Sequence, residues 1–522
     1  MDWDKVVDID RALKNVKNDL VGDWFRDPWD WPELDFVAKK RPDILYARLG
    51  AEGVARAAKI DVAKENFGIR PAIVMDPIDR LAYQAIVDSL SLKLGTGLPE
   101  TVYGWRLPRR DPERGSYSPN RTENEMYRRH ISTFGAHDSM SGLKTDIVSF
   151  FSNIPIDRLS ERIVERAGRS KPADRLIDML ASWDGSPRKG LPQRSAASAL
   201  LANLYLQPLD DALLEKVRVP TRRRGRTLRD IFHSLMMYER ILDGGQSARW
   251  MDDIWVFRRD VGELRTMQAQ IEGILRDLGL DINIAKTAVL EGEDLRAEIL
   301  NFAHSAAETS LLGDPKDYQP LRDLIDLLIA SPESSNRSTF KFTFRRMREH
   351  AVDYRLDDLV EVAHRAPHAA DAYARLFRDS ETYKDLHGWF VKHWKSSWAV
   401  SDWSVASLAT MFPVANIRKP MRELLASHIS QPGGSLAKTS FAASRLAIKD
   451  PENYRAAIRA ALKNSDHPLE RRVLALAALS CGEERQLVKK ALKEFSANQV
   501  TLEMLMATNF RTPKMIPDLA DR

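Results

Sequence analysis

The pattern of strand-like and helical segments changes at about residue 310, and this change limits the possible folds more than any single motif does. Before it, strand-like runs at 142–151, 249–257 and 281–290 alternate with helical stretches such as 195–206 and 261–278. After it, amphipathic helical segments follow one another, separated by short polar or Pro/Gly breaks. The pattern predicts an α+β region, with a sheet covered by helices, followed by an all-α region.

We therefore expect three parts: an N-terminal extension at 1–64, an α+β domain at 65–305 and a helical domain at 306–522. Helical segments such as 318–331 and 469–480 carry apolar residues at i, i+3 and i+4 spacing. Consecutive helices of this kind favour an α-solenoid with HEAT-like repeats. A compact helical bundle is the alternative.

The composition fits a globular protein with a substantial core, since 43% of the 522 residues are apolar and 29% are charged. No apolar run is long enough to suggest a membrane span, and the acidic N-terminus does not resemble a secretory signal. The single cysteine, Cys481, excludes a disulfide within the chain, so a reducing cytoplasm is the expected location. Trp24, Trp29 and Trp31 are expected to fill a core or an interface.

The net charge of +5 permits contact with nucleic acid but does not require it. Arginines gather in two stretches, 106–129 and 218–229. Each stretch has two interpretations of similar weight, a nucleic-acid surface or a solvated loop.

The segment ARWMDDIWVF, residues 248–257, places two adjacent aspartates among strand-forming residues. The natural interpretation is two short strands that meet at a tight turn occupied by Asp252 and Asp253. Buried carboxylates usually pair with cations or bind metal, because leaving them without a partner is costly. A hairpin turn with solvated aspartates is the alternative. The other Asp-Asp pairs, 210–211 and 357–358, lie in helical sequence, where exposed charge is ordinary.

A second acidic stretch, LKTDIVSFFSNIP at 143–155, places Asp146 among β-forming residues. Alone, an aspartate at a strand end is most often a cap or turn former. Together with Asp252 and Asp253 it would complete a carboxylate set. Magnesium prefers oxygen ligands and keeps waters and substrate phosphates in its shell, and a pair of such ions can activate an attacking oxygen beside a triphosphate. The three aspartates are therefore a candidate metal site.

Two further stretches gain meaning only from their place in the order. A Gly-Leu-Pro-Gln turn at 190–193 leads into a helix that begins with small residues, which allow close packing. The segment LGLDINIAKTAVL at 278–290 ends a helix, begins a strand and carries Lys286. Each alone is ordinary, the first as a helix packed on a sheet and the second as a surface lysine.

The order of these stretches is more specific than any one of them. Asp-x-x-x-Phe-Phe, then Gly-Leu-Pro-Gln with Leu-x-Asn-Leu, then Asp-Asp, then Leu-Gly-Leu with a later Lys-Thr, occur in sequence between residues 146 and 290. The series resembles motifs A to D of the reverse transcriptase palm. Upstream, residues 69–90 are similar to the fingers of retron and group II intron enzymes. The resemblance covers roughly residues 65–300.

The resemblance implies roles for individual residues. Asp146 and Asp252 would be the principal ligands of Mg²⁺ or Mn²⁺, with Asp253 a weaker or auxiliary ligand. Phe151, five residues after Asp146, would be a steric gate that favours deoxynucleotides. The remaining implied roles are nucleotide binding by Gln193, triphosphate contact from the fingers by Arg70 and Arg80, and stabilisation or protonation of the leaving pyrophosphate by Lys286.

The sequence also departs from the family pattern. Arg194 follows the Gly-Leu-Pro-Gln turn, where the family usually has glycine, and Ser198-Ala199 replaces the usual Ser-Pro. The usual aromatic-Ala-Asp-Asp reads Trp250-Met251-Asp252-Asp253. Because the turn normally lies against the template and the incoming nucleotide, a bulky cation there argues against ordinary template handling.

A diverged palm joined to a long helical region resembles the bacterial abortive-infection (Abi) polymerases and related defence-associated reverse transcriptases. In the Abi members the helical region is HEAT-like, synthesis needs no template and is primed on a protein hydroxyl, and the enzymes form oligomers. The resemblance implies a homo-oligomeric anti-phage polymerase that consumes dNTPs and carries its DNA product covalently. Tyr46 precedes the palm and is the candidate primer, since a phenol can replace a sugar 3′-hydroxyl as nucleophile.

Two alternatives remain. In the first, the same polymerase copies an associated non-coding RNA. In the second, the palm is inactive and the helical repeat is a scaffold for a partner, although the intact Asp146, Asp252 and Asp253 argue against this interpretation.

Overall fold

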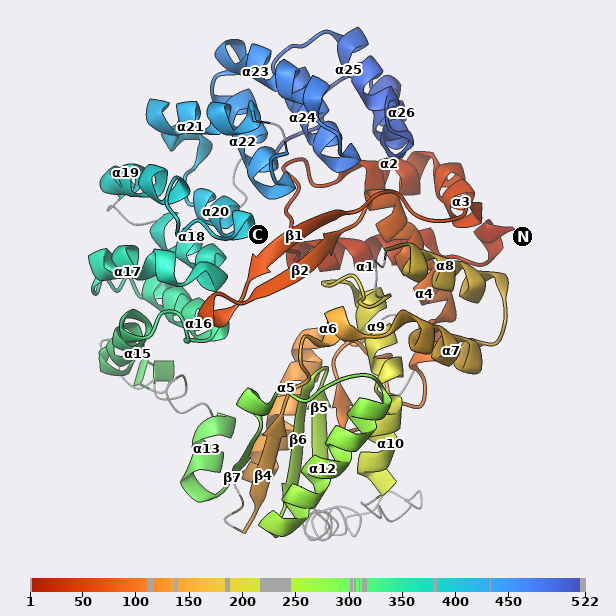
Figure 1. Ribbon diagram of the computed structural model, residues 1–522, viewed down its shortest axis with the longest axis vertical. Coiled ribbons are helices and arrows are strands. Elements are labelled where there is room, and N and C mark those ends of the chain that lie inside the picture. The colour runs from red at the N-terminus through yellow and green to blue at the C-terminus, as the bar shows by residue number, and fades with distance from the viewer. Residues whose placement is uncertain are drawn as a thin grey trace. The chain divides into compact units, whose positions relative to one another are not determined.

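A computed structural model gives the fold of the chain (Figure 1). It describes residues 2–109, 117–135, 137, 139–183, 188–215, 246–300, 304, 307–308, 310–311, 317–378, 383–431 and 433–516. The chain forms two compact units. The first consists of residues 1–11 and 83–305, and the second of residues 12–82 and 306–522. This division differs from three consecutive parts, since most of the N-terminal extension belongs to the same unit as the C-terminal helices.

A five-stranded sheet is the centre of the first unit. Its strand order is β3-β5-β6-β4-β7, with β3 parallel to β5 and the other neighbours antiparallel. The bounds of the strands are β3 (Val102–Tyr103), β4 (Ser141–Thr145), β5 (Gln246–Trp250), β6 (Asp253–Arg258) and β7 (Ala288–Leu290).

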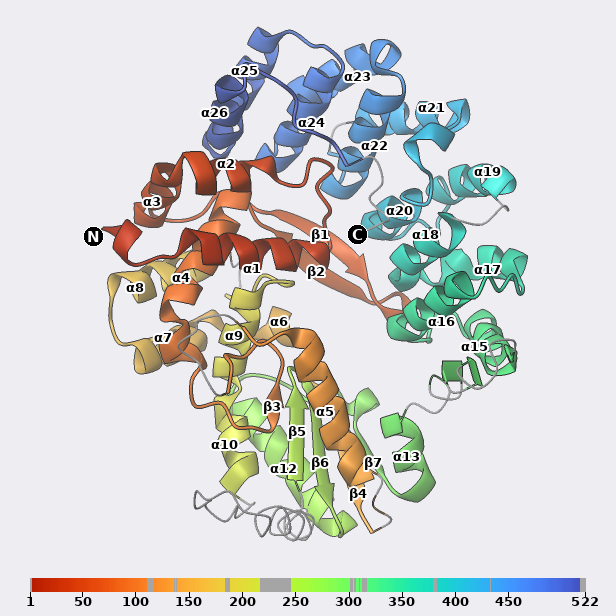
Figure 2. The same ribbon diagram turned by 180° about the vertical axis from the view of Figure 1, so that it is seen from behind.

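Helices cover both faces of this sheet. α5 (Asn120–Gly135) and α13 (Gly292–Leu300) pack on one face, and α12 (Val261–Asp277) packs on the other, as Figures 1 and 2 show from opposite sides. The core beneath α5 is aromatic, with Phe134 stacked on Phe257 and Phe257 stacked on Trp255. The other helices of this unit are α6 (Phe150–Asn153), α7 (Ile156–Ala167), α8 (Lys171–Trp183), α9 (Ala196–Tyr205) and α10 (Gln207–Glu215).

The predicted strands are confirmed in part. Residues 249–257 lie in the β5–β6 hairpin, and helices were correctly expected over 195–206 and 261–278. The strand expected over 142–151 is wrong beyond Thr145, because Ser149 has a φ of 44° and α6 begins directly after it. Of the strand expected over 281–290, only 288–290 forms β7, since residues 284–286 make a 3-10 turn.

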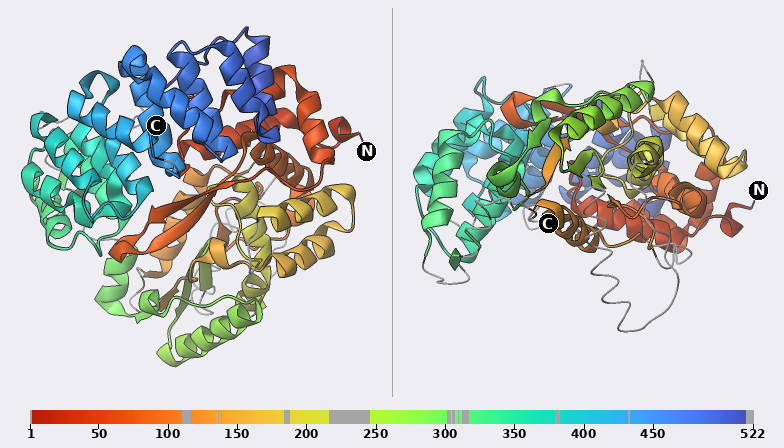
Figure 3. Two further views of the ribbon diagram at one scale, coloured as in Figure 1. Left: turned by 45° about the horizontal axis from the view of Figure 1, so that its top comes forward. Right: turned by 90° about the horizontal axis from the view of Figure 1, so that it is seen from below.

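Helices in two rows make up most of the second unit. α16, α18, α20, α22 and α24 contact one another in succession, and helices between them in sequence, such as α21 and α23, pack beside this row. Figures 1 and 3 show these helices following one another in chain order. The bounds are α15 (Gln319–Ala330), α16 (Arg337–Glu349), α17 (Leu356–Val362), α18 (Ala370–Arg378), α19 (Tyr383–Trp394), α20 (Asp402–Ala409), α21 (Lys419–Ile429), α22 (Leu436–Lys449), α23 (Pro451–Asn464), α24 (Pro468–Ser480), α25 (Arg485–Lys493) and α26 (Gln499–Ala507).

Local sequence explains where these helices begin. Proline stands in the first turn of α21, α23 and α24, where a missing backbone N–H costs nothing. Ser435 caps α22 by accepting a hydrogen bond from the backbone of Lys438. As expected, the described residues after 310 contain no strand. None of the helices in the described part of the chain combines the length and apolar content needed to cross a bilayer.

The N-terminal part of the second unit packs on these helices. It comprises α2 (Pro32–Lys40), α3 (Pro42–Gly50) and a hairpin of β1 (Ala58–Ala63) and β2 (Ile69–Val74), while α1 (Ile9–Val21) and α4 (Pro77–Gly95) each span a boundary between the units. Trp24, Trp29 and Trp31 are buried, as predicted. β1 contacts α20 and α22, and the backbone of Asp61 accepts a hydrogen bond from Ser401. The hairpin is thus held by the helical rows.

Candidate active site

The paired aspartates lie at the β5–β6 hairpin of the first unit. Trp250 pairs with Asp253 across the hairpin, so the two turn residues are Met251 and Asp252. The prediction that both aspartates occupy the turn is therefore wrong for Asp253, which begins β6. Met251 has a φ of 55°, in the left-handed region that favours glycine, and its side chain is buried. Burial of Met251 fixes this unusual turn.

Asp146 lies beside the hairpin, directly after β4. β4 pairs with β6, and its last pair joins Thr145 to Ile254, which brings Asp146 to the level of Asp253. The Asp146 Oδ2 atom accepts a hydrogen bond from Lys286 Nζ at 2.8 Å. Its Oδ1 atom is buried and accepts no hydrogen bond. A buried carboxylate oxygen without a donor is the acceptor that a cation would satisfy.

The electrostatics join the two strands into one site. The pKa of Asp253 is raised, first by loss of water around its carboxyl group and then by the nearby charge of Asp146. Lys144 and Lys286 act in the opposite direction. Asp253 as a residue remains exposed, so the loss of water is local to its carboxyl group, which still faces a neighbour of like charge.

Asp252 belongs to the same environment. The pKa of the buried Tyr127, on α5, is raised mainly by burial, and the charges of Asp253 and Asp252 raise it further. Within the described ranges, however, no three His, Cys, Asp or Glu side chains are close enough together to hold a metal ion. The structure brings Asp146 and Asp253 together with Lys286, and it places Asp252 next to them in the turn.

The Gly-Leu-Pro-Gln turn packs on the segment that follows Asp146. The Gly190 and Leu191 amides donate hydrogen bonds to the carbonyls of Ile154 and Phe151, at 2.9 and 2.7 Å. Gly190 has a φ of 103°, and a Cβ there would lie 3.3 Å from the carbonyl oxygen of Ser152. Gly190 is therefore required by both its conformation and its close approach.

Two of the four residues predicted to contact the nucleotide, Phe151 and Gln193, lie near this turn. Gln193 donates a hydrogen bond to the Ser152 hydroxyl at 3.1 Å, and Ser152 is the neighbour of Phe151. Phe151 is half-buried and packs edge-on against the buried Phe150. Their proposed roles remain predictions, but they do lie on adjoining segments.

Arg194, the residue that departs from the family pattern, has a φ of 57°. The left-handed conformation is the one for which glycine is the default residue. The backbone thus keeps the conformation that the usual glycine would favour, while the side chain is an arginine. Ser195 then caps α9 by accepting a hydrogen bond from the amide of Ser198.

A buried ion pair that was not predicted from the sequence supports the hairpin. Arg249 donates to both carboxylate oxygens of Asp210, at 2.7 and 2.6 Å, and to the Met251 carbonyl at 2.9 Å. The expectation of an exposed charge at Asp210 is wrong, because this residue on α10 is buried. The pKa of Asp210 is raised by burial, although Arg249 acts against this effect. The sequence did offer one signal for this pair, since Arg249 lies within an apolar strand and a buried arginine requires a buried partner of opposite charge.

Where the arginine-rich stretch 106–129 is described, Arg106 and Arg109 have structural contacts, whereas three arginines on α5 are exposed: Arg121, Arg128 and Arg129. Arg106 is buried and donates to the carbonyls of Pro99 and Val102, at 2.7 and 2.6 Å. Burial lowers the pKa of Arg106 to about 10. The second stretch, 218–229, lies outside the described residues.

The remaining predicted residues belong to the second unit. Arg70, on β2, packs over the ring of Trp24 at 5.4 Å from its centroid. Arg80 forms an ion pair with Asp23, and Tyr46 is half-buried on α3. Their contacts with nucleotide, and priming by Tyr46, remain predictions.

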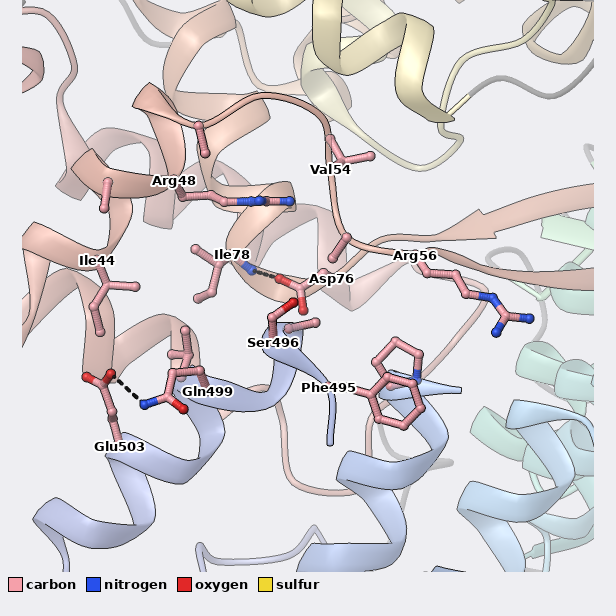
Figure 4. A pocket seen from close by; sticks show the side chains of 16 residues that line it. Ile44, Arg48, Val54, Arg56, Asp76, Ile78, Phe495, Ser496, Gln499 and Glu503 are labelled. Carbon is pink, nitrogen blue, oxygen red and sulfur yellow. Dashed lines mark hydrogen bonds between the residues drawn. The ribbon is translucent and has the colours of Figure 1, made fainter. Parts of the chain in front are cut away.

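A cavity of about 530 Å³ also lies in the second unit, between α3 and α26 (Figure 4). Asp76 faces it, but this carboxylate caps α4 by accepting a hydrogen bond from the Ile78 amide at 2.9 Å. Burial, and then the charge of Asp79, raise the pKa of Asp76 to about 7. Arg48 pairs with Asp79. These contacts are those of a helix cap and its counter-ion, so the carboxylates of the first unit are the better candidate site.

Comparison with known proteins shows which family this part of the chain resembles. Residues 62–319 match the family model for reverse transcriptase (RNA-dependent DNA polymerase). No curated protein matches the chain. Among solved structures, apo telomerase from Candida tropicalis is similar over 76% of this chain and 68% of that chain, with 10% identity and a TM-score of 0.30. Telomerase from Candida albicans in complex with the TWJ fragment of telomeric RNA is similar over 68% of both chains, with 10% identity and a TM-score of 0.29. The chain therefore carries a reverse transcriptase domain and is a nucleotidyltransferase of the DNA polymerase class.

Proposed function

We propose that the protein is a metal-dependent DNA polymerase of anti-phage defence that joins dNTPs without a template, starting from one of its own hydroxyl groups. The reverse transcriptase domain supplies the reaction class. Arg194 is the observation that carries the untemplated part, because it places a cation where the family usually has glycine.

The residues present fit a divalent cation. Asp146 offers a buried carboxylate oxygen without a hydrogen-bond donor, and the charges of Asp146 and Asp253 repel each other. A bound Mg²⁺ or Mn²⁺ would relieve both conditions. Asp146 and Asp253 would hold it, and Asp252, which is adjacent in the turn, would join them as a ligand only by moving closer. When bound, the metal neutralises the triphosphate and favours attack by the priming or growing hydroxyl.

The other site residues act on the nucleotide. Lys286 is already directed at the carboxylates, since it lies 2.8 Å from Asp146, and from there it would meet the charge of the leaving pyrophosphate. The Phe151 ring would lie under the sugar and exclude a 2′-hydroxyl. Gln193, fixed by Ser152, would line the same site.

Arg194 supports untemplated synthesis through its position. The turn from Gly190 to Gln193 packs on the segment that bears Phe151. A template base that approached this turn would meet the Arg194 backbone and side chain rather than an open glycine. The bulk and charge at this position therefore disfavour ordinary pairing of a template with the incoming nucleotide.

The second unit supports membership of the Abi type of polymerase. Its helices stack in two rows, with α16, α18, α20, α22 and α24 in contact one after another, and this stacking supports our proposal of a HEAT-like repeat. We further propose that the protein acts as a homo-oligomer in abortive infection. Tyr46 is the proposed primer, and the DNA product would remain attached to the protein.

The direct test is incubation of the purified protein with Mg²⁺ and each labelled dNTP, without primer or template. We expect labelled product that DNase degrades and that changes mobility after protease treatment. Tyr46→Phe should prevent initiation while leaving the folded state intact. Absence of incorporation with every dNTP would contradict the proposal, and unchanged labelling of Tyr46→Phe would reject that residue alone.

The description of the matching family as an RNA-dependent DNA polymerase favours a second candidate function, synthesis on an associated non-coding RNA. In that case activity would depend on RNA that copurifies with the protein. Treatment with RNase before dNTP addition would abolish it, whereas untemplated synthesis would persist.

A further inference from the structure

Cations surround one carboxylate, Asp371, in the second unit. Arg337 on α16 donates to both oxygens of Asp371 on α18, at 3.1 and 2.8 Å. Lys341, one helical turn after Arg337, has its Nζ atom 3.3 Å from the same carboxylate. Arg375, one turn after Asp371, also acts on this carboxylate electrostatically. We call Arg337, Lys341, Asp371 and Arg375 the Asp371 cluster.

Two tryptophan rings fix the position of the cluster. The Arg337 guanidinium lies 4.9 Å from the ring centroid of Trp24 and 5.5 Å from that of Trp403. The Arg70 guanidinium, from β2, lies 5.4 Å from the centroid of Trp24. The two rings pack edge to face and are buried. Both guanidinium groups are thus held in place by cation–π contacts.

The cluster carries more positive than negative charge. It has three cationic side chains, on α16 and α18, around Asp371. The pKa of Lys341 is lowered to about 8, first by burial, while Arg337 and Arg375 lower it further and Asp371 opposes them. The pKa of Asp371 is lowered to about 2, since these cations outweigh the effect of its burial. The Lys341 side chain is still 42% exposed and that of Arg337 20%, so an anion in solution can reach them.

We propose that the Asp371 cluster binds the phosphate groups of single-stranded DNA. Its cations come from two helices, α16 and α18. A DNA strand offers a phosphate at every nucleotide, whereas a nucleoside triphosphate concentrates its charge in one small group. Proteins that bind single strands without sequence preference use cationic surfaces of this kind. Trp24 is only 7% exposed and cannot stack on bases. Contact is therefore through phosphates and independent of sequence.

The ordinary structural interpretation is an ion-pair network that joins α16 to α18. A network of this kind needs Arg337 and Asp371, which already satisfy each other through two hydrogen bonds. It does not need a second and a third cation at the same carboxylate. Lys341 is therefore the residue that separates the two interpretations.

The test is binding of a fluorescent single-stranded oligonucleotide to the whole protein in EDTA, where no synthesis occurs. We expect Lys341→Gln to raise the Kd about three- to tenfold, and to reduce the slope of log K against log salt by about 0.7, the value for one phosphate contact on a single strand. Lys341→Arg should keep both values. Lys419→Gln, at a lysine on α21 whose side chain is 77% exposed, is the matched control and should bind like the unchanged protein.

The proposal is overturned if Lys341→Gln and the double variant with Arg375→Gln bind the oligonucleotide with unchanged affinity and salt slope. It is also overturned if these variants lose affinity for dATP alone, because the cluster would then be a triphosphate site. Thermal unfolding of each variant confirms that the fold is intact. Because the assay contains no metal, failure of the proposed polymerase activity would not affect its outcome.

Discussion

Each unit holds two carboxylates close together, and the two pairs are neutralised in different ways. In the second unit, Asp27 and Glu33 share Arg472, which donates to all four of their oxygens at 2.7 to 3.0 Å. In the first unit, Asp146 has Lys286 on one oxygen and no donor on the other, while Asp253 faces Asp146 with its pKa raised. The first pair is complete without a ligand, and the second is not.

The difference separates a structural pair from a functional one. Burial alone would raise the pKa of Glu33, but Arg472 outweighs it and the pKa is lowered. Because the counter-charge is part of the fold, Asp27 and Glu33 contribute to stability. Asp146 instead directly follows β4, and Asp253 begins β6. The sheet and the Arg249–Asp210 pair hold both positions, so the two carboxylates are kept close together and their charge remains available for a cation.

The largest expected effect is the loss of activity when Asp146, one member of the incomplete pair, is replaced. Asp146→Asn removes a metal ligand, and because metal stabilisation of a transition state is worth several kcal/mol, we expect incorporation of dNTPs to fall by at least about a thousandfold. Stability should change little, since Lys286 is 61% exposed and the pair contributes about 0–1 kcal/mol. Rates of dNTP incorporation and thermal unfolding measure the two effects.

The control is Asp157→Asn, at an exposed carboxylate on α7 that pairs with Arg188. It removes the same charge from the same unit and should leave incorporation unchanged. An Asp146→Asn variant that retains more than about a tenth of the activity would mean that this carboxylate is not a metal ligand.

For Asp27 and Glu33, the complete pair, the large expected effect is on stability. Arg472→Met leaves Asp27 and Glu33 buried and without their cation, which is expected to destabilise the second unit by about 3–5 kcal/mol. Replacing all three together, with Asp27→Asn and Glu33→Gln, should recover much of this loss, because no uncompensated charge remains. Chemical denaturation measures both. Arg365→Met is the matched control, since Arg365 is 43% exposed and its partner Glu333 is 35% exposed, and it should cost about 0–1 kcal/mol.

The same pair gives a pH dependence. Because the pKa of Glu33 in the folded protein is below its ordinary value of 4.5, its contribution to stability is fully present above that value. It is lost as the pH falls through the lower, folded-state pKa. The Arg472→Met variant should lack this acid-dependent loss, and a variant that kept it would place the effect at other carboxylates.

The contrast also marks what the sequence reveals. The order of Asp146, the Gly190 turn and Asp252 was enough to predict a candidate site, because the order of motifs can be read directly from the sequence. The partners of these residues could not be predicted, since Arg249 meets Asp210 and Arg472 meets Asp27 only after the chain has folded. A similar reason explains why Asp253 was wrongly assigned to the turn. The register of the hairpin is set by the pairing of Trp250 with Asp253, and the Asp-Asp sequence alone does not show this pairing.

The domain boundaries could not be fully predicted for the same reason, since they depend on contacts that form only after the chain has folded. Changes in the spacing of apolar residues along the chain show where strands stop and helices continue, which is why the described residues after 310 contain helices and no strand, as expected. They cannot show that residues 12–82 pack with helices more than 300 residues later. Such long-range packing is decided by side-chain contacts that leave no periodic signal.

The smallest expected effect is that of replacing Arg194, which tests whether this residue has a functional or a structural role. Arg194 has a φ of 57°, so Arg194→Gly should remove backbone strain and stabilise the first unit by about 1 kcal/mol. We also expect the variant to extend a primed template better than the unchanged protein and to retain less untemplated synthesis. Arg188→Gly is a close control, because Arg188 precedes the same turn with a φ of 52°, and it should gain stability without a change in template use. If both variants behave alike in the polymerase assays, the arginine at 194 does not govern template handling, and the incomplete carboxylate pair would then serve ordinary templated synthesis.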